Sequence, residues 1–298
     1  NYKMAKILIT GATGGLGGTT ARSLKEKKTS SDIAVLVRDK ESDKAQALAR
    51  EGFELRLGDY DNPDSLAEAF KGIDILYFVS ASDIGKRMPQ HKNVVETAKA
   101  SNIKHILYTS TVRKDESSEA PLHLVVDAHV KTEEWIKESG LTYTILRHNL
   151  YAEVIPMFLG EKEQLLQSKT IYLPTGSGKT SFVPREDFAE AEANILANPA
   201  PYENKILEFN GSEQISFEEV AKILTKTLSE PIEYVSPEVD EFKQTMASYQ
   251  LPEDIIEMLT MFSLGIADGE FNQKSDDLES VLGRKTKSIT DFLKAVYA

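Results

Sequence analysis

Short apolar runs alternate with amphipathic segments along the first half of the chain. Runs rich in β-branched or aromatic residues predict strands at residues 6–10, 33–37, 53–57, 75–79 and 105–109. Between them, apolar side chains recur with helical spacing at residues 16–27, 44–51, 64–70 and 90–101. Strands that alternate with helices at this interval predict right-handed βαβ units, and therefore an α/β fold with a Rossmann-type, doubly wound parallel sheet.

The second half of the chain carries a weaker pattern, in which four more elements are readable. They are a helix over residues 130–139, strands over 143–147 and 204–211, and a helix over 216–227. Gly140 closes the first helix. Ser216, followed three residues later by Glu219, forms a capping box at the start of the second helix. The run at 204–211 is predicted to return to the main sheet.

These elements predict two regions that share the chain. We expect a Rossmann domain at residues 4–155, extended by the returning strand near 204–211. We expect a smaller, interleaved, mainly helical C-terminal substrate region at 156–203 and 212–298. Residues 1–3 precede Met4, and we expect them to be a cloning remnant.

The composition favours a small-molecule ligand over a polymer. No apolar run approaches the ~20 residues that a membrane span needs, and we expect neither a span nor a leader peptide. The sequence contains no cysteine, which excludes disulfides, thiolate catalysis and cysteine-ligated metals. A net charge of −12 repels nucleic acid and anionic lipid. We therefore expect a cytoplasmic monomer or homodimer that acts on a small molecule, without nucleic-acid or membrane partners.

The string GSGKT at residues 176–180 resembles the phosphate-binding loop of a nucleotide triphosphatase. Leu173 stands where the first glycine of that loop belongs, although a shorter variant tolerates its loss. The loop must run directly into a helix, yet a β-like run ending at Pro184 follows Thr180. Two β-like runs around a Gly-Ser-Gly turn predict a hairpin instead.

A second glycine motif, ITGATGGLGGTTARSL at residues 9–24, directly follows the first predicted strand and opens a helix. In that context the pattern is typical of a dinucleotide-binding turn. Gly11 permits a tight turn, Gly14 lets backbone amides approach a pyrophosphate, and Gly17 lets the helix pack closely on the strand. The alternative at this point is a glycine-rich turn without a ligand.

The end of the second predicted strand favours NADPH over NADH. NAD-selective sites place an acidic residue about 20 positions after the glycine motif, where it binds the ribose 2′-hydroxyl. This chain has Arg38 there, and a guanidinium suits a 2′-phosphate, with Lys44 as a second charge. The alternative is that Arg38 is an ordinary exposed residue and Asp39 recognises the ribose.

Several motifs together resemble the NmrA-like branch of the atypical short-chain dehydrogenase/reductases, and within it most closely the bacterial NAD(P)H:quinone oxidoreductase and triphenylmethane reductase groups. The motifs are TGATGGLG, VLVRD, LGDYDNPDSL, VSASDIGKRMPQHKNVV, YTS, HVKTEEWIKESGLTYTILRHNLYAE and FVPREDFAEA. They run in order from Thr10 to Ala191. The tail of the chain is compatible with the same family.

The resemblance implies which residues bind the cofactor. They are, besides Arg38 and Lys44, Gly11, Ala12, Thr13, Gly14, Gly15, Leu16 and Gly17 at the pyrophosphate, Asp59 and Tyr60 near the adenine, Ser80, Ala81 and Ser82 beside the ribose and nicotinamide, His148, Asn149, Leu150, Tyr151 and Glu153 beneath the nicotinamide, and Arg185. The ends of parallel strands are where an open α/β sheet binds ligands. Asp59 has an equally good structural explanation, because Asp61, Asn62 and Pro63 follow it and are typical of a turn and helix cap.

The catalytic tyrosine of the wider superfamily is missing. That group uses a tyrosine whose pKa is lowered by a lysine four residues later, and the only such spacing here joins Tyr2 and Lys6 at the start of the chain. Aligning TEEW with the family helix puts Val125 at the tyrosine position and His129 at the lysine position. We take His129, Ser110 (or its neighbour Thr111) and Asn149 as catalytic candidates, each with a purely structural alternative. The spacing of the histidines predicts no metal site.

Without that tyrosine, oxidation of alcohols becomes less favourable, because a base must act at the reacting hydroxyl. A quinone is already a good hydride acceptor, so positioning it over the nicotinamide supplies much of the catalysis. We therefore predict an NADPH-dependent reductase of quinones or similar planar electrophiles. The alternatives are an inactive NADP(H)-sensing regulator of the NmrA type, and a sugar-nucleotide-type epimerase or reductase of the extended family.

Overall fold

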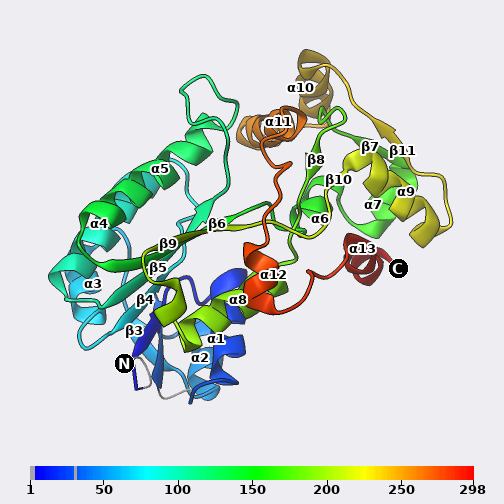
Figure 1. The fold of residues 1–298 in the computed structure, drawn as a ribbon. Coiled ribbons are helices and arrows are strands. Elements are labelled where there is room, and N and C mark those ends of the chain that lie inside the picture. The colour runs from blue at the N-terminus through cyan, green and yellow to red at the C-terminus, as the bar shows by residue number, and fades with distance from the viewer. Residues whose placement is uncertain (1–3, 30–31) are drawn as a thin grey trace.

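A computed structural model describes residues 4–29 and 32–298 and contains a seven-stranded, wholly parallel sheet (Figure 1). In sheet order the strands are β3 (Glu54–Leu57), β2 (Ile33–Val37), β1 (Ile7–Ile9), β4 (Ile75–Phe78), β5 (His105–Thr111), β6 (Thr142–His148) and β9 (Lys205–Phe209). The predicted doubly wound fold is confirmed, and so is the returning strand, which pairs with β6. The expected remnant at residues 1–3 lies outside the described residues.

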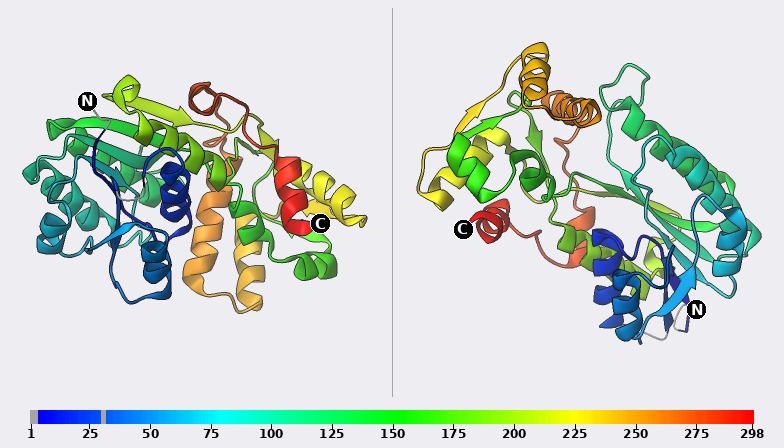
Figure 2. Two further views of the ribbon diagram at one scale, coloured as in Figure 1. Left: turned by 90° about the horizontal axis from the view of Figure 1, so that it is seen from below. Right: turned by 180° about the vertical axis from the view of Figure 1, so that it is seen from behind.

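Helices cover both faces of this sheet (Figures 1 and 2). One layer contains α1 (Gly15–Lys25), α2 (Asp43–Arg50), α8 (Arg185–Ala197) and α12 (Asp277–Leu282), and the other contains α3 (Pro63–Ala69), α4 (Arg87–Ala100) and α5 (His123–Glu138). Successive side chains of a strand point to opposite faces of the sheet, so Ile7 and Ile9 pack against the first helix layer and Leu8 packs against the second. Both sheet faces are therefore buried, as a parallel sheet requires.

Two helices begin more than one residue earlier than predicted. α4 begins at Arg87 rather than at 90, because a proline in the first turn, here Pro89, does not interrupt a helix. α5 begins at His123 rather than at 130. Its first two turns bury Val126 and His129, so tertiary packing outweighs the weak helix propensity of the valines there.

The predicted hairpin around the GSGKT string is wrong. Its two flanks do not pair with each other: β7 (Thr170–Tyr172) pairs with β11 (Glu233–Val235), and β8 (Lys179–Thr180) pairs with β10 (Ile215–Ser216). The turn instead packs on a helix, because a Cβ on Gly178 would lie 2.7 Å from the carbonyl carbon of Ile266. Lys179 lies in a strand and not at the start of a helix, which excludes the phosphate-loop geometry.

The remaining elements surround a second apolar core beyond one end of the sheet (Figures 1 and 2). They are α6 (Val154–Leu159), α7 (Lys162–Ser168), α9 (Phe217–Leu228), α10 (Val239–Ser248), α11 (Glu253–Ala267) and α13 (Ile289–Tyr297). The 3₁₀ turn Ala200–Tyr202 is the exception, because Tyr202 packs with the layer that contains α1 and α8. The capping box of α9 is confirmed by reciprocal bonds between Ser216 and Glu219. The division into two regions stays a prediction, although α8 and α12, from the ranges assigned to the smaller region, pack on the sheet. No described helix combines the length and hydropathy needed to cross a bilayer.

Candidate active site and cofactor pocket

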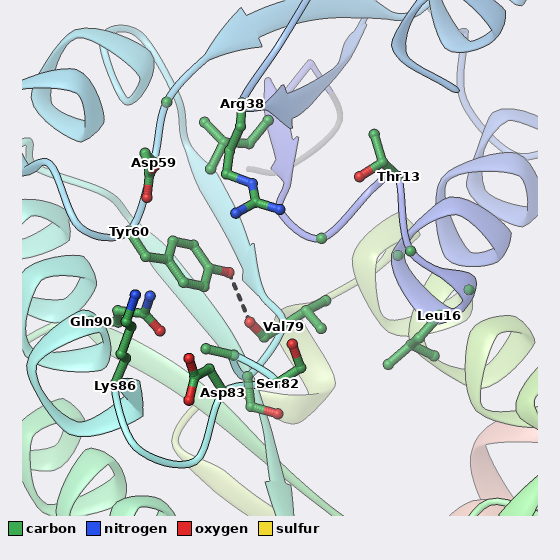
Figure 3. Close-up of a pocket in the computed structure, with 18 of the residues that line it drawn as sticks. Thr13, Leu16, Arg38, Asp59, Tyr60, Val79, Ser82, Asp83, Lys86 and Gln90 are labelled. Atoms are coloured by element: carbon green, nitrogen blue, oxygen red, sulfur yellow. Dashed lines mark hydrogen bonds between the residues drawn. The ribbon is translucent and has the colours of Figure 1, made fainter. Parts of the chain in front are cut away.

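A pocket of about 530 Å³ opens at the carboxyl ends of β1 and β4. β1 and β4 are neighbours in the sheet, but the chain continues from β1 towards β2 and β3 on one side and from β4 towards β5 and β6 on the other. The pocket therefore lies at the topological switch point, where open α/β sheets bind ligands. Figure 3 shows its walls, with the glycine-rich turn on one side and the segment that contains Tyr60 on the other. Its lining residues that were predicted from the sequence are Gly11, Thr13, Gly14, Gly15, Leu16, Gly17, Arg38, Asp59, Tyr60, Ser80, Ala81, Ser82, Tyr151 and Arg185.

The turn between β1 and α1 leaves amides free at the start of the helix. Gly11 has a φ of +63°, and its carbonyl accepts the Gly14 N–H at 3.0 Å. A Cβ on Gly17 would overlap the Gly11 carbonyl group, at 2.6 Å from its carbon. Among the described residues, the amides of Gly15, Leu16 and Gly17 have no acceptor, and no acidic side chain lies in the first turn. Such a helix end fits a phosphate.

A cation lies directly over this helix end. A Cβ on Gly15 would lie 2.6 Å from Cζ of Arg185, so the guanidinium packs on the first turn of α1. The backbone N–H of Arg185 donates to Oε1 of Glu153 at 3.0 Å, which fixes the start of α8 beside the pocket. The free amides and the guanidinium together form a compact anion site.

The opposite end of the pocket continues into a small cavity beside α2. Arg38 and Thr13 line both spaces, and Lys44 and Asp39 line the smaller one. Oδ1 of Asp39 accepts the Glu41 N–H at 2.9 Å, so this carboxylate holds its own turn. The two cations therefore face an extension of the pocket that suits a phosphate on the adenosine ribose.

Tyr60 forms the wall opposite the glycine-rich turn (Figure 3). Its hydroxyl lies 2.7 Å from the Val79 carbonyl oxygen and 2.6 Å from Oγ1 of Thr10, which ties this wall to β1 and β4. Asp59 lines the pocket while its Oδ1 accepts the Asp61 N–H at 2.9 Å. Asp59 thus has both a turn function and a place in the pocket, and the cap of α3 is provided by Asn62.

The floor between β4 and α4 is fixed by a histidine behind it. Nε2 of His91 accepts the Ala81 N–H at 2.9 Å, and its Nδ1 lies 2.9 Å from Oγ1 of Thr132. Burial, and next the charge of Arg87, lower the pKa of His91 to about 3. His91 is therefore neutral, with the Nδ1 proton that this pair of bonds requires.

His129 lies in the same buried layer and not on the pocket wall. The residue is 5% exposed, and its Nδ1 lies 2.6 Å from the Tyr108 hydroxyl. Burial, and then the charge of Arg87, lower the pKa of His129 well below its usual range. The structure thus gives His129 a protein partner, and it does not bring this imidazole to the pocket.

Ser110 also has a partner within the protein. Its hydroxyl donates to Glu133, a buried carboxylate that also binds the guanidinium groups of Arg113 and Arg147. Burial by itself would raise the pKa of Glu133, but the hydrogen bonds from the two arginines outweigh it and lower the pKa to about 2. Ser110 therefore supports an ion cluster at the end of β5 and does not line the pocket.

The segment after β6 is only partly exposed to the pocket. Tyr151 lines it, whereas Asn149 is buried and donates from Nδ2 to the Phe271 carbonyl oxygen at 2.9 Å. His148 is 6% exposed and lies behind Tyr151, with 3.3 Å between Nδ1 and the tyrosine hydroxyl. Predicted cofactor residues outside the main pocket lining are Ala12, Lys44, His148, Asn149, Leu150 and Glu153.

Sequence reasoning missed several residues that line the pocket. They are Leu36, Gly58, Asp61, Val79, Asp83, Lys86 and Gln90. Most of them directly flank a predicted site residue at the end of a strand, so extending each strand-end assignment by one or two positions would have found them. Lys86 and Gln90 lie at the start of α4, which the sequence placed too late.

Known proteins resemble this chain along its whole length. The NmrA-like family model matches residues 3–293. Quinone oxidoreductase 2 of Escherichia coli (strain K12) is 33% identical over 291 residues, which cover 98% of each chain. The NADPH complex of an NADPH-dependent quinone oxidoreductase from Escherichia coli matches with a TM-score of 0.89 at 32% identity, over 97% of this chain and 99% of that one. Triphenylmethane reductase of Citrobacter sp., complexed with NADP(H), gives a TM-score of 0.88 at 32% identity with the same coverage.

Proposed function

This chain belongs to the NmrA-like family and is an NADPH-dependent oxidoreductase, and on that premise we propose that it reduces quinones or similar planar electrophiles. The observation that carries the proposal is the likeness to a quinone oxidoreductase over 98% of both chains. The missing Tyr-x-x-x-Lys pair supports it, because an acceptor that is already electrophilic needs no base at a hydroxyl. The cytoplasm is the compartment that we propose.

We propose that the residues around the pocket hold NADPH in an extended conformation. The free amides of α1 and the Arg185 guanidinium bind the pyrophosphate, and Arg38 with Lys44 binds the 2′-phosphate. Ser80 and Tyr151 border the nicotinamide end. Bound there, the cofactor supplies a hydride, and the chain contributes orientation and the exclusion of water.

A substrate panel tests this proposal. Purified protein with NADPH and a series of benzoquinones and naphthoquinones is expected to consume the absorbance of the reduced nicotinamide in proportion to enzyme concentration. Tight NADPH binding without turnover of any acceptor would refute the reductase function. That outcome would instead favour a sensing role, in which the dinucleotide regulates contact with a partner.

A further inference from the structure

A buried line of hydrogen-bonding side chains leads away from the pocket beneath Tyr151. The Tyr151 hydroxyl lies 3.3 Å from Nδ1 of His148, and Nε2 of the same ring lies 2.6 Å from Oε2 of Glu192. Oε1 of Glu192 accepts the Tyr77 hydroxyl. Glu192 and Tyr77 are fully buried, and only Tyr151 reaches the pocket.

The arrangement fixes which atom of His148 exchanges a proton. The Glu192 carboxylate accepts hydrogen bonds, so Nε2 carries a proton and the tautomer is set. The imidazole stacks on Phe188, with 4.0 Å between ring centroids and 15° between the planes, and also on Phe209, which prevents the ring from turning over. In the neutral ring, Nδ1 accepts a hydrogen bond from the Tyr151 hydroxyl. In the imidazolium, Nδ1 carries a proton that it can donate to the Tyr151 oxygen.

The surroundings keep the Tyr151 hydroxyl protonated. Burial first, and then the negative charge of Glu192, raise the pKa of Tyr151 well above its usual range, while Arg185 opposes the rise and Glu153 adds to it. Tyr77 faces the pair from β4, and His129, on α5, is neutral. A phenol that does not ionise by itself is a proton donor only if a second acid replaces its proton at once.

We propose that Tyr151 is the catalytic acid for oxygen acceptors and that His148, held by Glu192, resupplies its proton. The inference rests on the proposed quinone reduction. When the acceptor has taken a hydride, one of its oxygens holds an extra electron pair. The Tyr151 O–H bond breaks as the product O–H bond forms, and the Nδ1–H bond of the His148 imidazolium breaks as the tyrosine O–H bond re-forms. His148 is left neutral, with its Nε2–H still donating to Glu192. After product release, a solvent proton passes through the Tyr151 hydroxyl and restores the proton on Nδ1.

Two hydride acceptors, one that also needs a proton and one that does not, distinguish a catalytic acid at Tyr151 from a purely structural tyrosine. A quinone needs a hydride and a proton, whereas a cationic triphenylmethane dye needs only the hydride to become neutral. Tyr151→Phe is expected to lower the ratio of quinone kcat to dye kcat by about 100-fold, the lower end of general acid catalysis. Loss of cofactor binding or positioning would slow both acceptors together. Tyr143→Phe, at the far end of β6, is the matched control and keeps the parent ratio.

A second readout needs no cofactor. In the free protein labelled with ¹⁵N-histidine, NMR is expected to show a protonated Nε2 on His148, and Tyr151→Phe is expected to shift the Nδ1 resonance. The proposal would be overturned if Tyr151→Phe left the ratio of the two kcat values unchanged, or if it left the Nδ1 resonance of His148 at its position in the parent protein. If the parent protein reduces neither acceptor, the proposed function fails instead, and the NMR result alone decides whether the hydrogen-bonded chain exists.

Discussion

Replacing Gly17 by alanine tests the packing on which the pocket depends. The added Cβ would lie 2.6 Å from the Gly11 carbonyl carbon and 2.8 Å from the Thr10 carbonyl oxygen, where ordinary contacts exceed 3.0 Å. Both neighbours are backbone atoms of the turn that we propose binds phosphate, so the helix must move away from the turn by several tenths of an ångström. Such overpacking costs about 1–3 kcal/mol.

Helix propensity works in the opposite direction. Alanine is favoured over glycine inside a helix by about 1 kcal/mol, so the net loss expected for Gly17→Ala is up to about 2 kcal/mol. Gly15→Ala, in the same turn, is the matched control. Its Cβ would meet only the flexible end of Arg185, which can swing aside, so its melting temperature should stay level or rise.

The assay combines thermal unfolding with NADPH titration. Gly17→Ala is expected to melt a few degrees below the parent protein, and to bind NADPH at least tenfold more weakly, because the displaced amides no longer converge on the phosphates. The reasoning is refuted if Gly17→Ala melts as high as Gly15→Ala and binds the cofactor as tightly as the parent protein.

Three further substitutions or titrations follow from the same structure. Arg38→Ala should weaken NADPH binding by about tenfold or more, since a charged hydrogen bond to phosphate contributes about 1.5–3 kcal/mol, and should leave NADH nearly unaffected; equal losses in calorimetric titrations would contradict the assignment. Glu133→Gln should cost about 3 kcal/mol of unfolding free energy, because it removes the buried carboxylate that Arg113 and Arg147 share. Each arginine then keeps only a more exposed partner, Glu116 or Glu208, and a chemical denaturation curve like that of the parent protein would count against the prediction. The pKa values of His91 and His105 are lowered by burial, to about 3 and about 4, and that of His129 is also lowered. Because the unfolded chain binds these protons first, stability should fall as pH drops below about 6.5, by about 1.4 kcal/mol per pH unit for each histidine. Melting temperatures that stay flat from pH 6.5 to pH 5 would show that the histidines are not buried neutral.

The sheet and the glycine-rich end of the pocket were predictable because their determinants are local. The strands are continuous buried runs, and β2 has the predicted ends, Ile33 and Val37. The glycine motif follows β1 directly, so its role depends only on neighbouring residues. Arg38 was predicted for the same reason, because it directly follows β2, and it lines the pocket.

The rest depends on contacts that local patterns do not encode. The two flanks of the GSGKT turn bury apolar side chains in the second core, and their pairing partners lie elsewhere in the chain. His129 and Ser110 stood at plausible strand and helix positions, yet tertiary neighbours bind both of them inside the protein. The bond between His148 and Glu192 joins a strand end to a helix 44 positions later, and no spacing rule in the sequence predicts it.

A crystal structure with NADP⁺ bound tests the account most directly. We predict that the pyrophosphate lies on the amides of Gly15, Leu16 and Gly17, that the 2′-phosphate contacts Arg38, and that the nicotinamide ends beside Tyr151. Density for the dinucleotide at another place, or a pyrophosphate that makes no contact with the first turn of α1, would contradict it.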